Sequence, residues 1–171
     1  MRNDYIKSFI VLVSICIVVA LLMGVANYFT SPIISESDRI KTEEALKEVM
    51  PDGEGFEKVT LSDVPSTVKQ IFKASNGGYV FKLVTNGYGT GLTIMCGINA
   101  EGKITGCKCI ESNETLGHEK TYGSAFVNIY TSEVSGIDTV SGATLTTKAY
   151  KNAIKDAVTV FNQLTDGKAV N

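Results

Sequence analysis

The stretch that decides the expected fold is YVFKLVTNGYGTGLTIMCGINAEGKITGCKCI, residues 79–110. Its three runs of branched, aromatic and aliphatic residues are separated at Asn86-Gly87 and Glu101-Gly102. Such runs favour strands, and glycine-containing steps supply the positive φ of hairpin turns. A further run at residues 68–74 precedes the Asn-Gly-Gly of residues 76–78. Together these segments predict an antiparallel meander.

The segment from about residue 146 to residue 164 has the periodicity of an amphipathic helix. Its apolar stripe consists of Ala153, Ile154, Ala157, Val158, Phe161 and Leu164. Charged residues such as Lys151 and Asp156 lie off this stripe. We therefore expect a helix packed on one face of the sheet, which makes the fold class α+β. A short helix is also expected around residues 124–130.

The N-terminal part differs, because residues 9–26 carry no charge and are almost entirely aliphatic. A helix over this stretch is about 27 Å long, close to the roughly 30 Å hydrocarbon core of a bilayer. A cleaved signal peptide is the alternative, but its apolar run usually has only about 7–15 residues. We expect a retained transmembrane anchor over residues 1–29. Lys7 lies closer to the apolar stretch than Arg39 does, which favours a cytoplasmic N-terminus.

Residues 30–55 are expected to form a helical stalk. Ser31-Pro32 should break the first helix, and a serine shortly after it can cap a second one. The apolar residues of this second helix end at Pro51, and are Ile40, Leu46, Val49 and Met50. Residues 56–171 would then form the extracytoplasmic domain.

Charge and cysteine content argue against two classes of site. With 16 Lys and Arg against 18 Asp and Glu, the chain has no basic stripe for nucleic acid. The cysteines lack zinc-motif spacing and His118 is the single histidine, so no metal site is expected.

A tight hairpin at residues 100–103 would place Cys96 opposite Cys107. A disulfide is then one alternative, and reduced packed thiols, which we favour, are the other.

Residues 141–144, Ser-Gly-Ala-Thr, lie where a loop enters the last predicted helix. Backbone N–H groups at a helix start lack intrahelical partners and attract anions such as phosphate. Gly142 lets the backbone approach a bulky group closely, and Ala143 leaves room beside it. A purely structural cap through the side chain of Ser141 or Thr144 is the alternative, and spacing alone leaves both open. No nucleophile and base pair emerges, so no catalytic residue is expected.

Residues 138–144, Asp-Thr-Val-Ser-Gly-Ala-Thr, resemble the flavinylation motif of FMN-binding domains. In that family a flavin transferase uses FAD to esterify the last threonine of the motif to the phosphate of FMN. The resemblance makes Thr144 the attachment residue. Its recognition context consists of Asp138, Ser141, Gly142 and Ala143, and the adjoining cofactor-binding residues are Leu145 and Thr146.

A second stretch resembles the Glu-Thr-Pro-Gly segment that lies beside the isoalloxazine ring in this family. It follows the run KITGCKCIES and consists of Glu114, Thr115, Leu116 and Gly117. Leu116 stands in place of the proline of the family. His118 and Glu119 follow, where Leu-Gly is common.

With the N-terminal anchor included, the resemblance covers almost the whole chain. It points to the G subunits of the Rnf electron-transport complexes, ahead of the related C subunits of sodium-pumping NADH:quinone reductases. It implies an electron carrier in a membrane complex that couples electron flow between ferredoxin and NAD to sodium or proton translocation. The implied partners are the other subunits, the flavin transferase and membrane lipid. A stand-alone cell-surface flavoprotein reductase and a membrane-tethered binding module without flavin remain alternatives.

Overall fold

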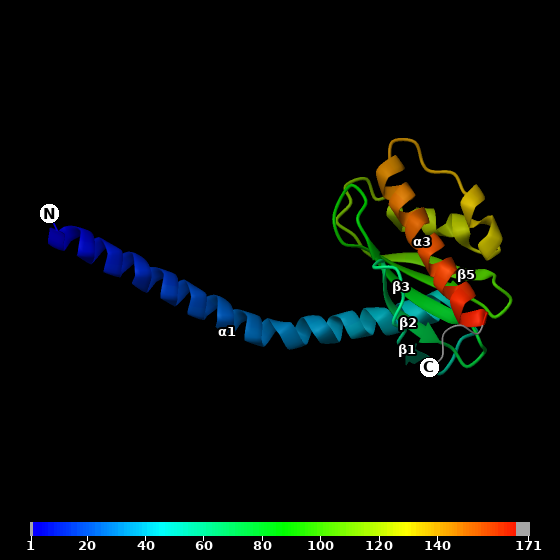
Figure 1. Ribbon diagram of the computed structural model, residues 1–171, viewed down its shortest axis with the longest axis horizontal. Helices are drawn as coiled ribbons and strands as arrows, with labels where there is room; N and C mark the ends of the chain where they lie inside the picture. Colours follow the sequence, from blue (N-terminus) through cyan, green and yellow to red (C-terminus); the bar gives the residue numbers. More distant parts are fainter. Residues whose placement is uncertain (1, 167–171) are drawn as a thin grey trace. The chain divides into compact units, whose positions relative to one another are not determined.

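The computed structural model describes residues 2–166 of the chain (Figure 1). The chain divides into two compact units, Met1–Thr42 and Glu43–Asn171. The boundary falls inside α1 (Arg2–Val49), so the last turns of this helix belong to the second unit.

The first unit is helical throughout its described residues. The helical stretch Phe9–Tyr28 is long and apolar enough to cross a membrane. Its side chains are not buried against any other part of the described chain. The predicted helix break at Ser31-Pro32 is wrong, because α1 continues through it. A proline removes one helical hydrogen bond and costs about 3 kcal/mol. The bonds of the long helix on both sides are retained, so the loss stays local.

The second unit is built on a five-stranded antiparallel sheet with the order β1-β2-β3-β4-β5. The strands are β1 (Glu57–Val59), β2 (Val68–Lys73), β3 (Tyr79–Thr85), β4 (Leu92–Ile98) and β5 (Ile104–Glu111). The predicted meander is confirmed for β2 to β5. The sequence did not predict β1, which is an edge strand of 3 residues with two exposed side chains and no apolar alternation.

One face of the sheet is covered by α3 (Thr144–Thr165), drawn in orange to red in Figure 1. Its buried residues include Tyr150, Ile154 and Phe161, which join the same apolar core as Phe81 and Ile94 of the sheet. The predicted amphipathic helix and the α+β fold class are therefore confirmed. The helix begins two residues before the predicted start at about residue 146.

The other face of the sheet receives the end of α1 through Val49 and through Met50, the residue that follows the helix. Gly97 and Gly106 face each other on β4 and β5, and a Cβ at Gly106 would lie 2.5 Å from Val49 Cα. These two glycines therefore let the helix backbone lie directly on the sheet. The Thr105 hydroxyl donates a 2.7 Å hydrogen bond to the Val49 carbonyl. The end of the predicted stalk thus belongs to the folded unit.

Between β5 and α3 the chain forms short helical segments. They are α2 (Glu119–Tyr122), η1 (Gly123–Phe126) and η2 (Thr131–Gly136). The predicted short helix at residues 124–130 is confirmed only for its first turn, which is η1, because the helix ends at Phe126 and Asn128 has a positive φ of 68°. In addition, the Ile104 backbone accepts a 2.8 Å hydrogen bond from Asn128 and donates a 2.9 Å hydrogen bond to Ile129. These bonds attach the segment to the start of β5 instead of allowing a helix.

The register places Cys96 directly opposite Cys107, as expected from the hairpin. Both cysteines are buried free thiols in this structure. The hydrogen bond with Cys107, together with burial, raises the pKa of Cys96 well above its usual value. Cys107 also lies 3.5 Å from the Tyr150 hydroxyl, so this thiol pair is part of the core under α3.

Candidate functional site

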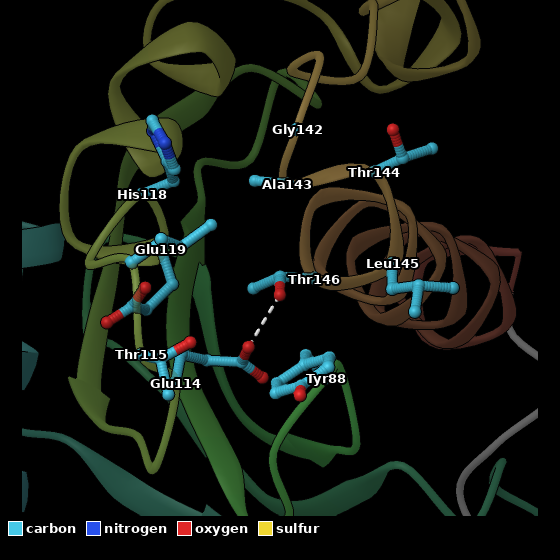
Figure 2. Close-up of a pocket in the computed structure, with 11 residues that line it drawn as sticks. Tyr88, Glu114, Thr115, His118, Glu119, Gly142, Ala143, Thr144, Leu145 and Thr146 are labelled. Atoms are coloured by element: carbon cyan, nitrogen blue, oxygen red, sulfur yellow. Dashed lines mark hydrogen bonds between the residues drawn. The ribbon is translucent and has the colours of Figure 1, made fainter.

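A cavity of about 330 Å³ lies at one end of the folded unit (Figure 2). Three segments that are distant in sequence form its walls: the β3–β4 loop, the chain that follows β5, and the start of α3. The lining residues are Tyr88, Glu114, Thr115, Leu116, His118, Glu119, Gly142, Ala143, Thr144, Leu145 and Thr146. Its volume is within the range of small-molecule pockets.

Glu114 connects all three walls. Its Oε2 accepts a 2.5 Å hydrogen bond from the Thr146 hydroxyl, drawn as a dashed line in Figure 2. Its Oε1 accepts a 3.1 Å hydrogen bond from the backbone N–H of Gly89. Hydrogen bonds to an ionised group are stronger than neutral ones, so this carboxylate holds the loop and the helix start together.

The β3–β4 loop requires glycine where it meets the wall. A Cβ at Gly87 would lie 2.4 Å from Glu114 Oε1 and 2.9 Å from Thr146 Cα. A Cβ at Gly89 would lie 2.4 Å from the Asn113 carbonyl oxygen. No side chain fits at these distances, so the glycine-rich sequence of this loop is explained by close backbone contact.

The start of α3 lacks the cap that a structural helix end usually has. Its N-cap residue is Ala143, and no side-chain cap hydrogen bond is formed there. The first helical bond runs from Thr147 N to the Ala143 carbonyl, at 2.9 Å. The N–H groups of Thr144, Leu145 and Thr146 come before this first helical hydrogen bond in the chain. The alternative of a cap through Ser141 or Thr144 is therefore wrong.

Thr147 stabilises the turn that leads into α3. Its fully buried hydroxyl accepts from Val140 N at 3.1 Å and donates to the Ala143 carbonyl at 3.0 Å. The side chain of Thr144 is exposed, and its hydroxyl lies 3.5 Å from the Val140 carbonyl, at the limit of a hydrogen bond. In Figure 2 Thr144 lies at the edge of the cavity, away from the pair of Glu114 and Thr146.

Most of the predicted site residues come together in this cavity, but three do not line it. Gly117 forms the adjacent turn with a φ of 72°. Ser141 is exposed, and so is Asp138, whose carbonyl accepts a 2.8 Å hydrogen bond from the Tyr122 hydroxyl.

Sequence reasoning assigned no site role to three lining residues, Tyr88, His118 and Glu119. Tyr88 lies in the glycine-rich loop, so an aromatic residue between glycines was the available signal. For the other two, the only signal was their departure from the Leu-Gly that is common in the family. Their place in the cavity depends on how α2 packs.

The walls combine an apolar rim with an uncapped helix start. Tyr88, Leu116 and Leu145 expose 72%, 66% and 64% of their surface although they are large and apolar. Gly142 has a φ of 84°, and no atom lies within 4 Å of where its Cβ would be. An open helix N-terminus suits an anion, and the apolar rim suits a flat ring. The arrangement therefore fits a ligand such as FMN, which carries both groups.

Cys109 lies near the cavity on β5 but does not line it. Burial, together with the nearby Glu119 carboxylate, raises the pKa of the Cys109 thiol to about 11. The thiol therefore stays protonated near neutral pH and is a poor nucleophile or metal ligand. Among the residues that the structure describes, no group of three or more His, Cys, Asp or Glu side chains is placed to hold a metal.

In a comparison with known protein families, residues 87–159 match the FMN-binding domain. The matched stretch contains the β3–β4 loop, the segment after β5 and most of α3. It therefore includes all three walls of the cavity.

Relatives that match over most of their length are G subunits of ion-translocating complexes. The chain is 28% identical to the G subunit of the Na(+)-translocating ferredoxin:NAD(+) oxidoreductase complex of Acetobacterium woodii, over 92% of each chain. It is 23% identical to the G subunit of the proton-translocating ferredoxin:NAD(+) oxidoreductase complex of Clostridium ljungdahlii, over 90% of this chain and 89% of that one. It is also 23% identical to the G subunit of an ion-translocating oxidoreductase complex of Shewanella piezotolerans, over 95% of this chain and 92% of that one. The predicted resemblance to G subunits is confirmed.

Proposed function

Because the chain contains an FMN-binding domain and is related to G subunits over nearly its whole length, we propose that it is an electron-carrying subunit of an ion-translocating oxidoreductase complex. We propose further that the complex is a membrane-bound ferredoxin:NAD oxidoreductase of the Rnf type. FMN is held covalently, through a phosphoester to the Thr144 hydroxyl.

One observation carries the attachment proposal. Thr144 presents an exposed hydroxyl on the first turn of α3, and no side chain caps that turn. A phosphate on this hydroxyl lies beside the first N–H groups of the helix and at the positive end of its dipole. The hydroxyl that receives the phosphate therefore lies at the helix start that favours an anion.

The attachment step balances without any oxidant or reductant. The Thr144 oxygen forms a new bond to the phosphorus nearest the riboflavin moiety of FAD. The bond between this phosphorus and the bridging oxygen of the pyrophosphate breaks, and AMP leaves. The hydroxyl proton passes to a base of the flavin transferase.

FMN supplies the redox chemistry when it is attached. The residues of the chain hold it: Glu114 fixes the loop against the helix start, and Tyr88, Leu116 and Leu145 offer apolar surface. A covalent tether keeps the flavin on an exposed domain at a high effective concentration.

Residues 1–29 anchor the chain as a single membrane span, and residues 30–55 form a stalk whose end packs on the sheet. Residues 56–171 form the rest of the FMN domain, outside the cytoplasm. The apolar helix Phe9–Tyr28 supports the anchor. The partners in this proposal are the other membrane and peripheral subunits, the flavin transferase during maturation, and membrane lipid. Protease added to intact spheroplasts should digest the FMN domain, and full protection of the domain would reverse the orientation.

The attachment is tested by co-expressing the full chain with a flavin transferase. We expect a fluorescent band on a denaturing gel and a mass increase of one FMN minus one water. Thr144→Ala should lose both, whereas Thr139→Ala, a change at an exposed threonine outside the cavity, should retain both. Fluorescence that survives in Thr144→Ala but disappears in Thr146→Ala would move the attachment to Thr146. Absence of flavin from the wild-type chain would contradict the proposal.

A further inference from the structure

The second turn of α3 carries a lysine whose charge has no partner. Lys148 is exposed and forms no hydrogen bond or ion pair within the described part of the chain. Its own helix offers no acidic neighbour, because the residues three and four positions away are Thr144, Leu145, Lys151 and Asn152. A positive charge near the start of a helix also faces the positive end of the helix dipole. An anion close to Lys148 would offset both effects.

Lys148 lies one turn after the hydroxyl that is proposed to carry the flavin. Side chains at positions i and i+4 of a helix are neighbours, with Cβ atoms about 5–6 Å apart. Side chains on a helix lean toward its N-terminus, so the stem of Lys148 leads back toward the turn that holds the exposed Thr144. A lysine stem is flexible, and its ammonium group is a usual partner of phosphate.

The other lysine in the first three turns of α3 is already engaged. Lys151 donates a 3.1 Å hydrogen bond to the Ser135 carbonyl and a 2.6 Å hydrogen bond to the Ile137 carbonyl. Its ammonium group therefore stabilises the loop that leads to the motif. Residues 138–147 themselves contain no Lys, Arg or His. Lys148 is thus the lysine in these turns that is left to meet a phosphate.

We propose that the ammonium group of Lys148 binds the phosphate of the FMN attached to Thr144. The inference rests on the proposed function, because the phosphate arrives with the flavin. A phosphate that links threonine to riboflavin keeps a negative charge at neutral pH, which the first N–H groups of α3 and Lys148 then share. The ion pair restricts rotation of the phosphate about the threonine side chain. It therefore limits the directions in which the flavin can leave the helix start.

The first experiment measures how fast Lys148 is acetylated in the wild-type full chain in detergent, with and without attached FMN. A trace of acetic anhydride reacts with free amines, and peptide mass spectrometry reports each lysine separately. Attachment should slow the acetylation of Lys148 about threefold, as expected for an exposed ion pair near a helix N-terminus. Lys155 is the matched control. It lies on the same helix, about 16 Å beyond Thr144 along the axis, and should keep its rate.

Salt distinguishes an ion pair from simple shielding by the flavin. At about 1 M salt the screening length is roughly 3 Å, so most of the slowing at Lys148 should disappear. Equal rates with and without FMN would overturn the inference. So would a slowing that salt leaves unchanged, since the flavin would then only cover the lysine. Absence of FMN from the wild-type chain would instead contradict the proposed function, so the two failures are distinguishable.

The second experiment compares the melting temperature with and without attached FMN in wild type, Lys148→Met and Lys148→Arg. Methionine removes the charge, and arginine keeps it. The rise caused by attachment should be about 2 °C smaller in Lys148→Met, and Lys148→Arg should recover most of it. Lys155→Met should keep the full rise. An equal rise in wild type and Lys148→Met would overturn the inference. If Lys148→Met takes up no flavin, the acetylation of the wild type decides.

Discussion

The two helix ends that meet the sheet are built in opposite ways. At the C-terminus of α1, the Val49 carbonyl is bonded by the Thr105 hydroxyl, and its backbone lies directly on Gly97 and Gly106. At the N-terminus of α3, the cap residue offers no side-chain oxygen, and Thr144 is exposed. One end is closed by packing and the other is left open.

The difference separates structure from binding. A helix end that serves only the fold has its polar groups satisfied by the protein itself, because unsatisfied groups cost free energy. A helix end that waits for a ligand leaves its N–H groups accessible. Changes at the closed end should therefore affect stability, and changes at the open end should affect what the protein holds.

The largest effect on stability is expected for Gly106→Val. A Cβ there would lie 2.5 Å from both Cα and O of Val49, so the end of α1 must leave the sheet. We expect the free energy of unfolding to fall by about 3 kcal/mol. A urea titration of the full chain in detergent, followed by the near-UV circular dichroism of its tyrosines, measures this. Gly136→Val is the control, since no atom lies within 4 Å of its Cβ position. Equal losses in both variants would contradict the packing argument.

A smaller effect is expected for Thr105→Val. The change keeps the shape of the side chain but removes the hydroxyl that donates to the buried Val49, so it should cost about 1.5 kcal/mol in the same titration. Thr105→Ser retains a hydroxyl and should recover part of the loss. If valine and serine behave alike, the hydrogen bond contributes nothing measurable.

At the open end, Gly142→Ala should cost about 1 kcal/mol. The reason is the backbone alone, since φ is 84° and no atom lies near the Cβ position. The titration should place this variant between Thr105→Val and wild type. Gly136→Ala, where φ is not positive, should be neutral. A loss as large as that of Gly106→Val would show that the open end is packed after all.

The smallest effect on stability is expected for Thr144→Ala in the chain without flavin. The side chain is exposed and forms no cap, so the free energy of unfolding should change by less than about 0.5 kcal/mol. Thr147→Val, three residues further along the same helix, removes a buried hydroxyl with two partners and should destabilise clearly. A destabilised Thr144→Ala chain would mean that Thr144 also has a structural role.

Much of the fold follows from patterns between neighbours in sequence. The strands β2 to β5 were predicted from apolar runs and glycine turns, and α3 from its stripe. The break at Pro32 was wrongly predicted, because one lost hydrogen bond does not end a long helix. The helix predicted at residues 124–130 ends after its first turn at Phe126, because the pairing of Asn128 with Ile104 overrides local preference.

The sequence by itself determined the strands β2 to β5, the amphipathic and apolar helices, and the flavinylation-like motif that singles out Thr144. Only the tertiary structure decided that Glu114 bonds Thr146, 32 positions away, and that Glu119 is buried with one oxygen free. The physical reason is that periodicity and turn chemistry act between neighbouring residues, whereas loss of water and choice of hydrogen-bond partner depend on which distant segments pack together. The cavity is assembled at that second level.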